Sequence, residues 1–253
     1  MLELEKHGKL LVLRLNNPAK LNAWSGAVRE DIRKALASAD KDLQIAAAVI
    51  TGTGGRSFCA GADLSDPTMS IPSAAAGRMT AFQDFYVGIQ SFRKPLVAAL
   101  NGFALGSAFQ AVLLMDYRVA HAGVRFGLPE INSGMPCITG SAILSWSVGP
   151  MLARSIAVSG RFMEAQEASS LGMLEEIVPA EAVEERSLQV ADELAAKSPE
   201  AFAETKQWLR DLTLPALEAA FARAAEVRAK EEITRSVKSG ISGFFAGHNA
   251  RNA

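Results

Sequence analysis

Short apolar runs that end near glycine residues alternate with helical stretches over roughly the first 180 residues, and this alternation restricts the possible folds most strongly. Residues 45–51 and 96–100 are uncharged and hydrophobic, which is typical of strands buried on both faces of a sheet. Residues 77–92, which lie between them, favour a helix. Because strands that alternate with helices are typical of α/β proteins, we expect an α/β fold with a largely buried sheet.

Other stretches extend this pattern. Residues 2–7 and 10–16 alternate between apolar and polar side chains and predict a β-hairpin. Ser25 is a favourable N-cap for a helix that we expect to continue to about residue 40. Residues 106–115 predict an apolar helix, and residues 117–121 predict the strand that follows it.

The pattern becomes helical after residue 180, where charges recur against Leu, Ala and Phe. We expect Pro199 and Pro215 to separate three helices, because proline lacks an N–H group and clashes with the preceding turn. These helices should span about residues 181–196, 200–211 and 216–237. They either cap the same core or form a partly separate module that contacts another subunit.

The composition excludes several classes of function. The chain has 253 residues, 49% of them hydrophobic, which is enough for a core of its own and too apolar for a disordered chain. Its 26 basic and 27 acidic side chains give a formal net charge of -1, so we expect no nucleic-acid partner. The histidines and cysteines show no metal-ligand spacing, and we expect no metal site.

The chain also carries signals about its compartment. Cys59 and Cys137 are too few for a disulfide framework, and residues 1–6 are charged, unlike a signal peptide. We therefore expect a cytoplasmic protein. Residues 95–115 and 131–153 are uncharged and long enough to cross a bilayer. Their polar, glycine and proline residues would leave backbone groups unsatisfied in lipid, so we expect them in the interior of a soluble protein, with no membrane partner.

Two glycine-containing segments are candidates for chemistry. Residues 57–64 and 101–110 each follow a predicted strand, and the second also opens a predicted helix. A strand that leads through glycine into a helix exposes backbone N–H groups at a positive helix end, where an anion can bind. Either segment alone is weak evidence, because glycines after strands usually form ordinary turns.

The order of four segments resembles the enoyl-CoA hydratase/isomerase (crotonase) family over most of the chain. The segments are a Pro-x-Lys-x-Asn-Ala loop within residues 17–23, the glycine segments at 58–64 and 101–106, and Phe-Gly-Leu-Pro-Glu-Ile at 126–131, which follows Asp116. The resemblance implies an α/β spiral of repeated ββα turns with a C-terminal helical region. It also implies a trimer or a pair of trimers, and a substrate held as a coenzyme A thioester without a prosthetic group. We accordingly divide the chain into a crotonase-like core, residues 1–195, and a C-terminal helical oligomerisation or cap region, residues 196–253.

The resemblance assigns two backbone N–H donors, those of Ala62 and Ser107, to the thioester oxygen. Negative charge develops on that oxygen in an enolate, and fixed donors stabilise it without reorganising. The family usually has glycine where Ser107 stands. A negative φ at Ser107 would keep its N–H in place, and its hydroxyl would then either add a further donor or simply pack as a small group.

The resemblance also matches Gln110 and Glu130 to the two glutamates of hydratases in the family. Glutamine cannot exchange a proton, so Gln110 either holds a water or substrate group, or only satisfies its neighbours. Glu130 is then the one acid/base we predict. Its apolar sequence neighbours should disfavour the charged form and raise its pKa, whereas without the resemblance it reads as an exposed loop residue.

For coenzyme A, the resemblance implies contacts from Lys20, Ala23, Ala60, Asp63 and Leu64. Lys20 could meet a phosphate, although a surface lysine is often only solvated. We expect Asp63 to cap a short helix that presents Ala62.

Further residues have smaller expected roles. Asn132 and Ser133 should line the acyl pocket, and Asp116 should support structure. Cys59 and Cys137 lack a histidine partner nearby in sequence, which disfavours a nucleophilic role. The family's tail often touches coenzyme A of a neighbouring subunit, and Phe244, Phe245 and His248 lie at that position.

Three hypotheses of function follow. Glu130 could move a proton between carbons of an enoyl thioester, as an isomerase does, or it could activate water for hydration with Gln110 orienting that water. The third is a catalytically silent acyl-CoA-binding scaffold. Other enolate reactions, such as decarboxylation or retro-aldol cleavage, remain open.

Overall fold

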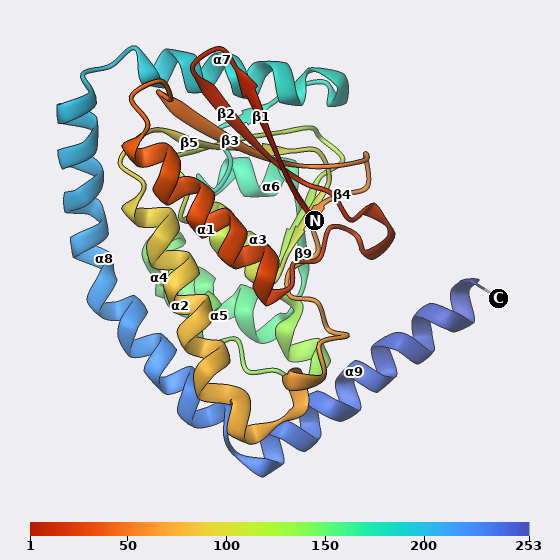
Figure 1. Ribbon diagram of the computed structural model, residues 1–253. Coiled ribbons are helices and arrows are strands. Elements are labelled where there is room, and N and C mark those ends of the chain that lie inside the picture. Colours follow the sequence, from red (N-terminus) through yellow and green to blue (C-terminus); the bar gives the residue numbers. More distant parts are fainter. Residues whose placement is uncertain (253) are drawn as a thin grey trace.

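The computed structural model describes the backbone of residues 1–252 and the side chains of residues 1–69 and 71–243. Its strands form a six-stranded sheet, in the order β1-β2-β3-β5-β7-β10, and a four-stranded sheet, in the order β4-β6-β8-β9 (Figure 1). The strands are β1 Leu2–His7, β2 Leu10–Leu15, β3 Ala47–Gly52, β4 Ser57–Cys59, β5 Leu96–Leu100, β6 Phe103–Leu105, β7 Tyr117–Ala120, β8 Arg125–Gly127, β9 Phe162–Glu164 and β10 Glu176–Ile177.

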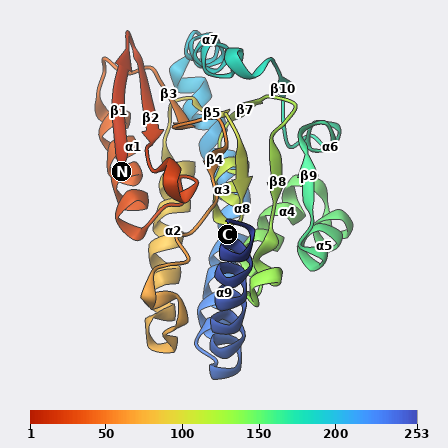
Figure 2. The same ribbon diagram turned by 90° about the vertical axis from the view of Figure 1, so that its right-hand side faces the viewer.

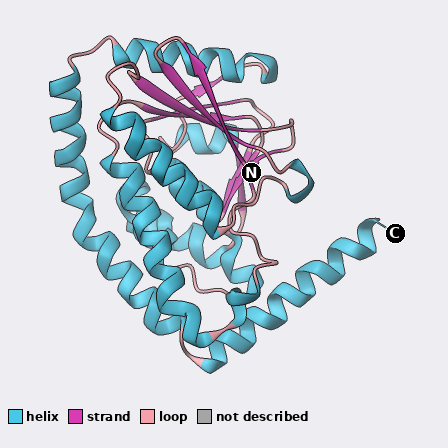
Figure 3. Cartoon of the chain, in the orientation of Figure 1, coloured by secondary structure: helices cyan, strands magenta, loops and turns pink. Residues whose placement is uncertain are grey.

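Helices surround these sheets and form the C-terminal part of the chain, where α9 packs against η2 and η4 and its C-terminal end projects beyond them (Figures 1 and 3). The α-helices are α1 Gly26–Lys41, α2 Ala75–Ser91, α3 Ser107–Leu113, α4 Ile138–Val148, α5 Pro150–Ser159, α6 Ala165–Ser170, α7 Val183–Ala195, α8 Pro199–Arg228 and α9 Glu231–Asn252. Short 3-10 helices are η1 Pro18–Lys20, η2 Pro67–Ser70, η3 Pro72–Ala74, η4 Pro129–Ser133 and η5 Ala180–Ala182.

The inner strands β3 and β5 of the six-stranded sheet are buried on both faces, as the uncharged runs predict. Side chains alternate along β3, so Val49 belongs to one hydrophobic cluster and Ile50 to the other. The cluster of Val49 is completed by Val190 of α7, and that of Ile50 by Ile32 of α1 and Ile89 of α2. The predicted α/β class is therefore confirmed, with helices covering both faces of the sheet.

The local predictions for the first half of the chain largely hold. β1 and β2 form the expected antiparallel hairpin, in which Leu2 lies opposite Leu15. Helix α1 begins after Ser25, whose hydroxyl oxygen accepts a hydrogen bond from the Val28 N–H at 3.3 Å. Strand β5 has the predicted bounds, whereas the helix expected at 106–115 is the shorter α3.

The prediction that Pro215 ends a helix is wrong. Helix α8 continues through it, and the break falls instead between Arg228 and Glu231. Pro215 is exposed, as is Asp211, whose carbonyl loses its helical donor to the proline and can be hydrated instead. Beyond the proline, the buried side chain of Phe221 anchors the second half of α8 in the core. The packing of this half offsets the missing hydrogen bond.

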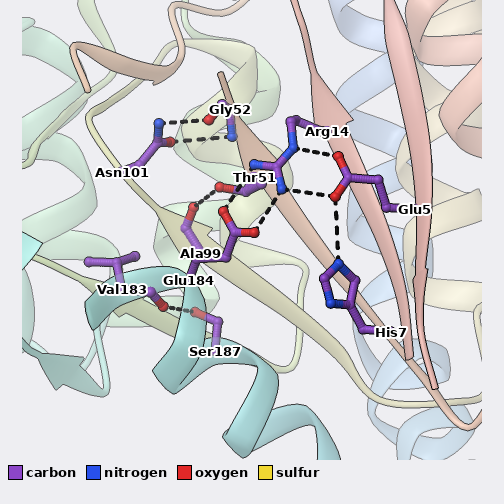
Figure 4. Close-up of polar contacts among 10 residues, drawn as sticks. All are labelled: Glu5, His7, Arg14, Thr51, Gly52, Ala99, Asn101, Val183, Glu184 and Ser187. Atoms are coloured by element: carbon purple, nitrogen blue, oxygen red, sulfur yellow. Dashed lines mark hydrogen bonds and ion pairs between the residues drawn. The ribbon is translucent and has the colours of Figure 1, made fainter. Parts of the chain in front are cut away.

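Polar contacts tie the ends of neighbouring strands together (Figure 4). The Asn101 amide donates to the Gly52 carbonyl at 2.7 Å, and the Gly52 N–H donates back to the Asn101 side-chain oxygen at 3.3 Å. On the hairpin, Arg14 pairs with Glu5 at 2.8 Å and with Glu184 of α7 at 2.7 Å. These contacts hold the second glycine segment at the end of β5 and hold α7 on the sheet.

No helix among the described residues is both long and apolar enough to cross a membrane. The uncharged stretches at residues 95–115 and 131–153, which are long enough to cross a bilayer, instead form interior elements such as β5, which is buried at every residue.

Candidate active site

A cavity of about 770 Å³ lies where the two glycine segments, η4 and helices α2, α8 and α9 meet. The segments come together because β4 and β6 pair in parallel, with Cys59 opposite Ala104. The chain therefore leaves both strands at the same edge of the four-stranded sheet. Helix α9 lies on this side of the sheet and lines the cavity (Figure 2). Of the predicted catalytic residues, the cavity wall contains Ala62, Ser107, Gln110 and Glu130.

The two glycine segments are in direct contact, and glycine is required for it. Gly61 has φ +94°, and a Cβ there would lie 2.7 Å from the Leu105 carbonyl oxygen and 3.4 Å from the Ser107 nitrogen. Gly106 has φ +56° and directly precedes helix α3. Since only glycine adopts such backbone conformations without strain, both positions are fixed by the turn itself.

The backbone of Ala62 is held on both sides by Trp24. The Trp24 N–H donates to the Gly61 carbonyl at 2.9 Å, and the Asp63 N–H donates to the Trp24 carbonyl at 3.2 Å. The N–H of Ala62 makes no hydrogen bond among the described residues. A rigid segment with a free donor thus borders the cavity.

Ser107 is the first residue of α3, so its N–H lacks an acceptor within the helix. Its φ is not positive, because the positive-φ non-glycine residues in the described chain are Leu21 and Asn22. Serine can therefore stand where the family usually has glycine, because the backbone here does not need a positive φ. The indole Nε1–H of Trp24 donates to Ser107 Oγ at 3.0 Å, which leaves the hydroxyl proton available to another acceptor.

Gln110 and Glu130 are joined directly. The Gln110 amide nitrogen donates to Glu130 Oε1 at 2.8 Å, and the Gln110 amide oxygen accepts from Tyr86 at 3.1 Å and from Thr139 at 2.8 Å. Tyr86 also bonds the Ser107 carbonyl oxygen, at 3.0 Å. The orientation of Gln110 is therefore fixed by two donors, and its amide N–H positions Glu130.

Glu130 is the one acidic side chain among the described residues that line the cavity. Its Oε2 atom is buried and has no hydrogen-bond partner among those residues. Burial raises the pKa of Glu130, and hydrogen bonds, including that from Gln110, oppose this rise in part. A carboxyl with a raised pKa and one unused oxygen suits proton transfer.

The predicted coenzyme A contacts are only partly brought together. Ala60 and Leu64 line the cavity, whereas Ala23 does not. Lys20 donates to Asp63 Oδ2 at 3.0 Å and to a neighbouring serine hydroxyl at 2.9 Å, and about half of its side chain is exposed. Lys20 is thus a partly solvated cation at the surface.

The expectation that Asp63 caps a helix is wrong. Asp63 Oδ1 accepts from the Ser65 N–H at 2.9 Å and closes a local turn. The first helix after Ala62 is η2, and its N-cap is Asp66. Aspartate favours such turns as strongly as helix N-caps, and a sequence alone does not separate the two.

The remaining candidates divide clearly. Asn132 and Ser133 line the cavity as predicted. Asp116 lies away from it and accepts from the Leu96 N–H at 2.8 Å and from Lys206 at 2.6 Å. The tail residues Phe244, Phe245 and His248 lie outside the described side chains.

Both cysteines are poor nucleophiles here. Burial raises the pKa of the Cys59 thiol to about 12, and burial together with the nearby Glu130 raises that of Cys137 further. Among the described side chains, no group of three His, Cys, Asp or Glu residues is placed to hold a metal ion.

Sequence reasoning missed four residues of the site: Trp24, Tyr86, Thr139 and Arg228. They come from different elements far apart in the chain. Thr139 lies in the uncharged stretch 131–153, whereas Trp24, Tyr86 and Arg228 lie in segments with no unusual pattern. Trp24 directly follows the family-like loop at residues 17–23, and this position is the one signal in the sequence that could have identified it.

The chain is similar to known proteins over most of its length. A family model described as enoyl-CoA hydratase/isomerase matches residues 5–250. The 2,3-dehydroadipyl-CoA hydratase of Escherichia coli (strain K12) is 37% identical over 238 residues, which cover 94% of this chain and 92% of that protein. The short-chain-enoyl-CoA hydratase of Clostridium acetobutylicum is 30% identical over 207 residues, covering 81% and 78%.

A crystal structure of an enoyl-CoA hydratase/isomerase from Mycobacterium paratuberculosis superimposes with a TM-score of 0.86 over 96% of this chain and 97% of that chain. At 23% identity this likeness shows the fold alone, which confirms the crotonase-like architecture.

The chain belongs to the enoyl-CoA hydratase/isomerase family. It is accordingly an acyl-CoA enzyme of the hydratase/isomerase type.

Proposed function

We propose that the protein is a one-base enoyl-CoA enzyme in which Glu130 carries the proton and the backbone N–H groups of Ala62 and Ser107 stabilise the enolate. The observation that carries this proposal is the pairing of a single cavity carboxyl with a neutral amide, Gln110 Nε2 to Glu130 Oε1 at 2.8 Å. One carboxyl can remove and return a proton, whereas glutamine cannot act as an acid or base.

The reaction that this arrangement favours is movement of a double bond along the acyl chain. The Glu130 carboxylate removes a proton from C2 of a 3-enoyl thioester, and the electrons of the C–H bond pass to the thioester oxygen. Glu130 then returns the proton to C4, and the double bond ends between C2 and C3. The substrate gains and loses no atoms overall, because the same proton leaves C2 and returns to C4, so no second acid or base is needed.

The two N–H donors act on the thioester oxygen during this step. Both are fixed before substrate arrives, Ala62 by the Trp24 backbone and Ser107 by its place at the start of α3. Loss of one such donor typically costs on the order of 10²–10³ in rate. The Ser107 hydroxyl, whose oxygen accepts from Trp24, is a further donor available to the substrate.

Hydration of a 2-enoyl-CoA is the second candidate, because two relatives that cover most of the chain are named hydratases. Glu130 would then take a proton from water as the water oxygen bonds to C3, and would deliver a proton to C2. Gln110 would orient Glu130 in either reaction.

The test is incubation of the protein with matched 2-hexenoyl-CoA and 3-hexenoyl-CoA in deuterated water, followed by NMR and mass analysis. Isomerisation converts the 3-enoyl into the 2-enoyl thioester, and hydration yields the 3-hydroxyacyl thioester. Binding without either product would identify a silent scaffold and contradict the proposal. A requirement for a 2-carboxy or 3-hydroxy substrate would point instead to decarboxylation or retro-aldol cleavage.

We also propose a homotrimer or homohexamer in the cytoplasm, with residues 1–195 as the core and 196–253 as the oligomerisation or cap region. Helix α8 supports an interface, because Trp208, Leu209 and Leu212 are each more than half exposed. The two free cysteines are consistent with a reducing compartment.

A further inference from the structure

The cavity contains a cation that the proton-transfer chemistry does not use. One face of α8 presents Leu217, Phe221 and Ala224 to the interior, and the next position on that face is Arg228. Phe221, Ala224 and Arg228 all line the cavity. An arginine at the end of an apolar helix face, inside a cavity, requires a chemical explanation.

Arg228 is unpaired among the described side chains. Among the described residues it makes no ion pair or hydrogen bond, whereas Arg223, on the preceding turn of α8, pairs with Glu226 at 2.9 Å. Arg228 and Glu130 are the two charged side chains among the described residues that line the cavity. They do not form an ion pair: Glu130 Oε1 accepts from Gln110, and Glu130 Oε2 has no hydrogen-bond partner among the described residues.

The environment of Arg228 is unfavourable for a lone cation. Burial, together with the positive charge of Arg78, lowers the pKa of Arg228 to about 10. The guanidinium is still protonated at neutral pH. Arg78 donates to backbone carbonyls, including that of Ile71 at 3.2 Å, and is a second cation near Arg228 rather than a partner for it. Isolated charges of this kind are costly in a partly desolvated site unless a ligand pairs with them.

The wall of the cavity that contains Arg228 is otherwise suited to a methylene chain. Met69, Met79, Phe82 and Phe221 supply flexible thioether and aromatic surface. Arg228 also lies close enough to Glu130 for its charge to act on that carboxyl. An acyl chain whose reacting carbons lie at Glu130 therefore has apolar surface along its length and a cation within the same cavity.

We propose that Arg228 binds a carboxylate at the far end of the acyl group, so that the preferred substrates are enoyl-CoA thioesters of dicarboxylic acids. Arginine forms paired, charge-assisted hydrogen bonds with carboxylates, which gives both affinity and orientation. This inference rests on the proposed acyl-CoA function of the cavity and specifies its substrate class.

The test measures binding rather than turnover, so that it does not depend on which reaction is catalysed. Calorimetry compares saturated adipyl-CoA with hexanoyl-CoA, which has the same number of carbons and no terminal charge. Adipyl-CoA should bind at least about tenfold more tightly. The monomethyl ester of adipyl-CoA should bind like hexanoyl-CoA, which tests the charge without altering the protein.

Arg228→Met should remove the preference for adipyl-CoA and leave hexanoyl-CoA affinity unchanged or improved. Arg223→Met is the matched control, because it removes an exposed arginine from the same helix, and it should keep the parent preference. Equal affinity of the parent for adipyl-CoA and hexanoyl-CoA would overturn the carboxylate site while leaving the proposed function intact.

Two other outcomes are also decisive. If Arg228→Met weakens both thioesters and free coenzyme A equally, Arg228 binds a coenzyme A phosphate and the inference is wrong. If the parent binds neither thioester, the proposed acyl-CoA function fails together with it.

Discussion

Replacement of Gln110 by glutamate tests the division of labour in the site most sharply. The Gln110 amide nitrogen lies 2.8 Å from Glu130 Oε1, so the variant places a second carboxylate oxygen at about the same position. Two like charges at that separation repel by about 6 kcal/mol at an effective dielectric constant of ~20. This energy corresponds to about 4 pKa units, so the pair should retain one shared proton at neutral pH.

The proton should reside mainly on Glu130. Tyr86 and Thr139 already donate to the side-chain oxygen at position 110, at 3.1 Å and 2.8 Å, and these bonds would stabilise the new carboxylate in its charged form. The variant would thus hold one base and one acid, the arrangement that adds water to a double bond. We expect faster hydration of a short 2-enoyl-CoA than in the parent, and slower isomerisation of a 3-enoyl-CoA.

The assay follows both reactions by NMR over a range of pH. Gln110→Leu is the matched control, because it removes the same hydrogen bonds without adding charge, and it should lower both rates. If Gln110→Glu leaves the hydration rate and its pH dependence unchanged, the two side chains are not coupled in the working enzyme and the reasoning from their contact is refuted.

Three further predictions concern Tyr86, the charge of Glu130 and assembly. Tyr86→Phe removes the one hydroxyl donor that Gln110 and the Ser107 carbonyl share, and it should cost about 1 kcal/mol in urea unfolding. An unchanged midpoint would contradict this. The Glu130 pKa is higher in the folded than in the unfolded protein. Glu130 therefore adds to the free energy of unfolding below its unfolded-state pKa, and this contribution is lost as pH rises through its folded-state pKa. Unfolding curves of Glu130→Gln, taken between these two pKa values, should lack this loss of stability. Light scattering at micromolar concentration should give a trimer or hexamer that Leu209→Asp weakens, and a monomeric mass for the parent would contradict the proposed interface.

The sequence predicts the α/β class and the two glycine segments because both are local properties. A short uncharged run such as residues 96–100 favours a strand buried on both faces, and Gly61 and Gly106 mark turns that other residues adopt only with strain. Pro215 shows the limit of local reasoning. Its exposed position and the packing of Phe221 decide the outcome, and neither is visible before the fold is known.

The same limit applies to the site. Glu130 and Gln110 can be identified by motif, but the role of Gln110 depends on Tyr86 and Thr139, which lie on other helices. Arg228 sits in an ordinary amphipathic stretch, and only its place in the cavity without a counterion separates it from a surface arginine such as Arg223. Residues that only the tertiary structure brings together show no regular spacing in the sequence, so a sequence pattern cannot reveal them.

Turnover and ligand affinity of Glu130→Gln, measured together, test the central claim that one carboxyl transfers the proton. The substitution keeps the shape of the side chain and keeps an oxygen that can accept from Gln110. The one-base mechanism predicts that kcat falls by about 10²–10⁴-fold or more, because general acid–base groups typically contribute that much. It also predicts that the Kd for a saturated acyl-CoA stays nearly the same, because the Ala62 and Ser107 donors remain. Normal turnover in this variant would contradict the mechanism and place the catalytic group elsewhere.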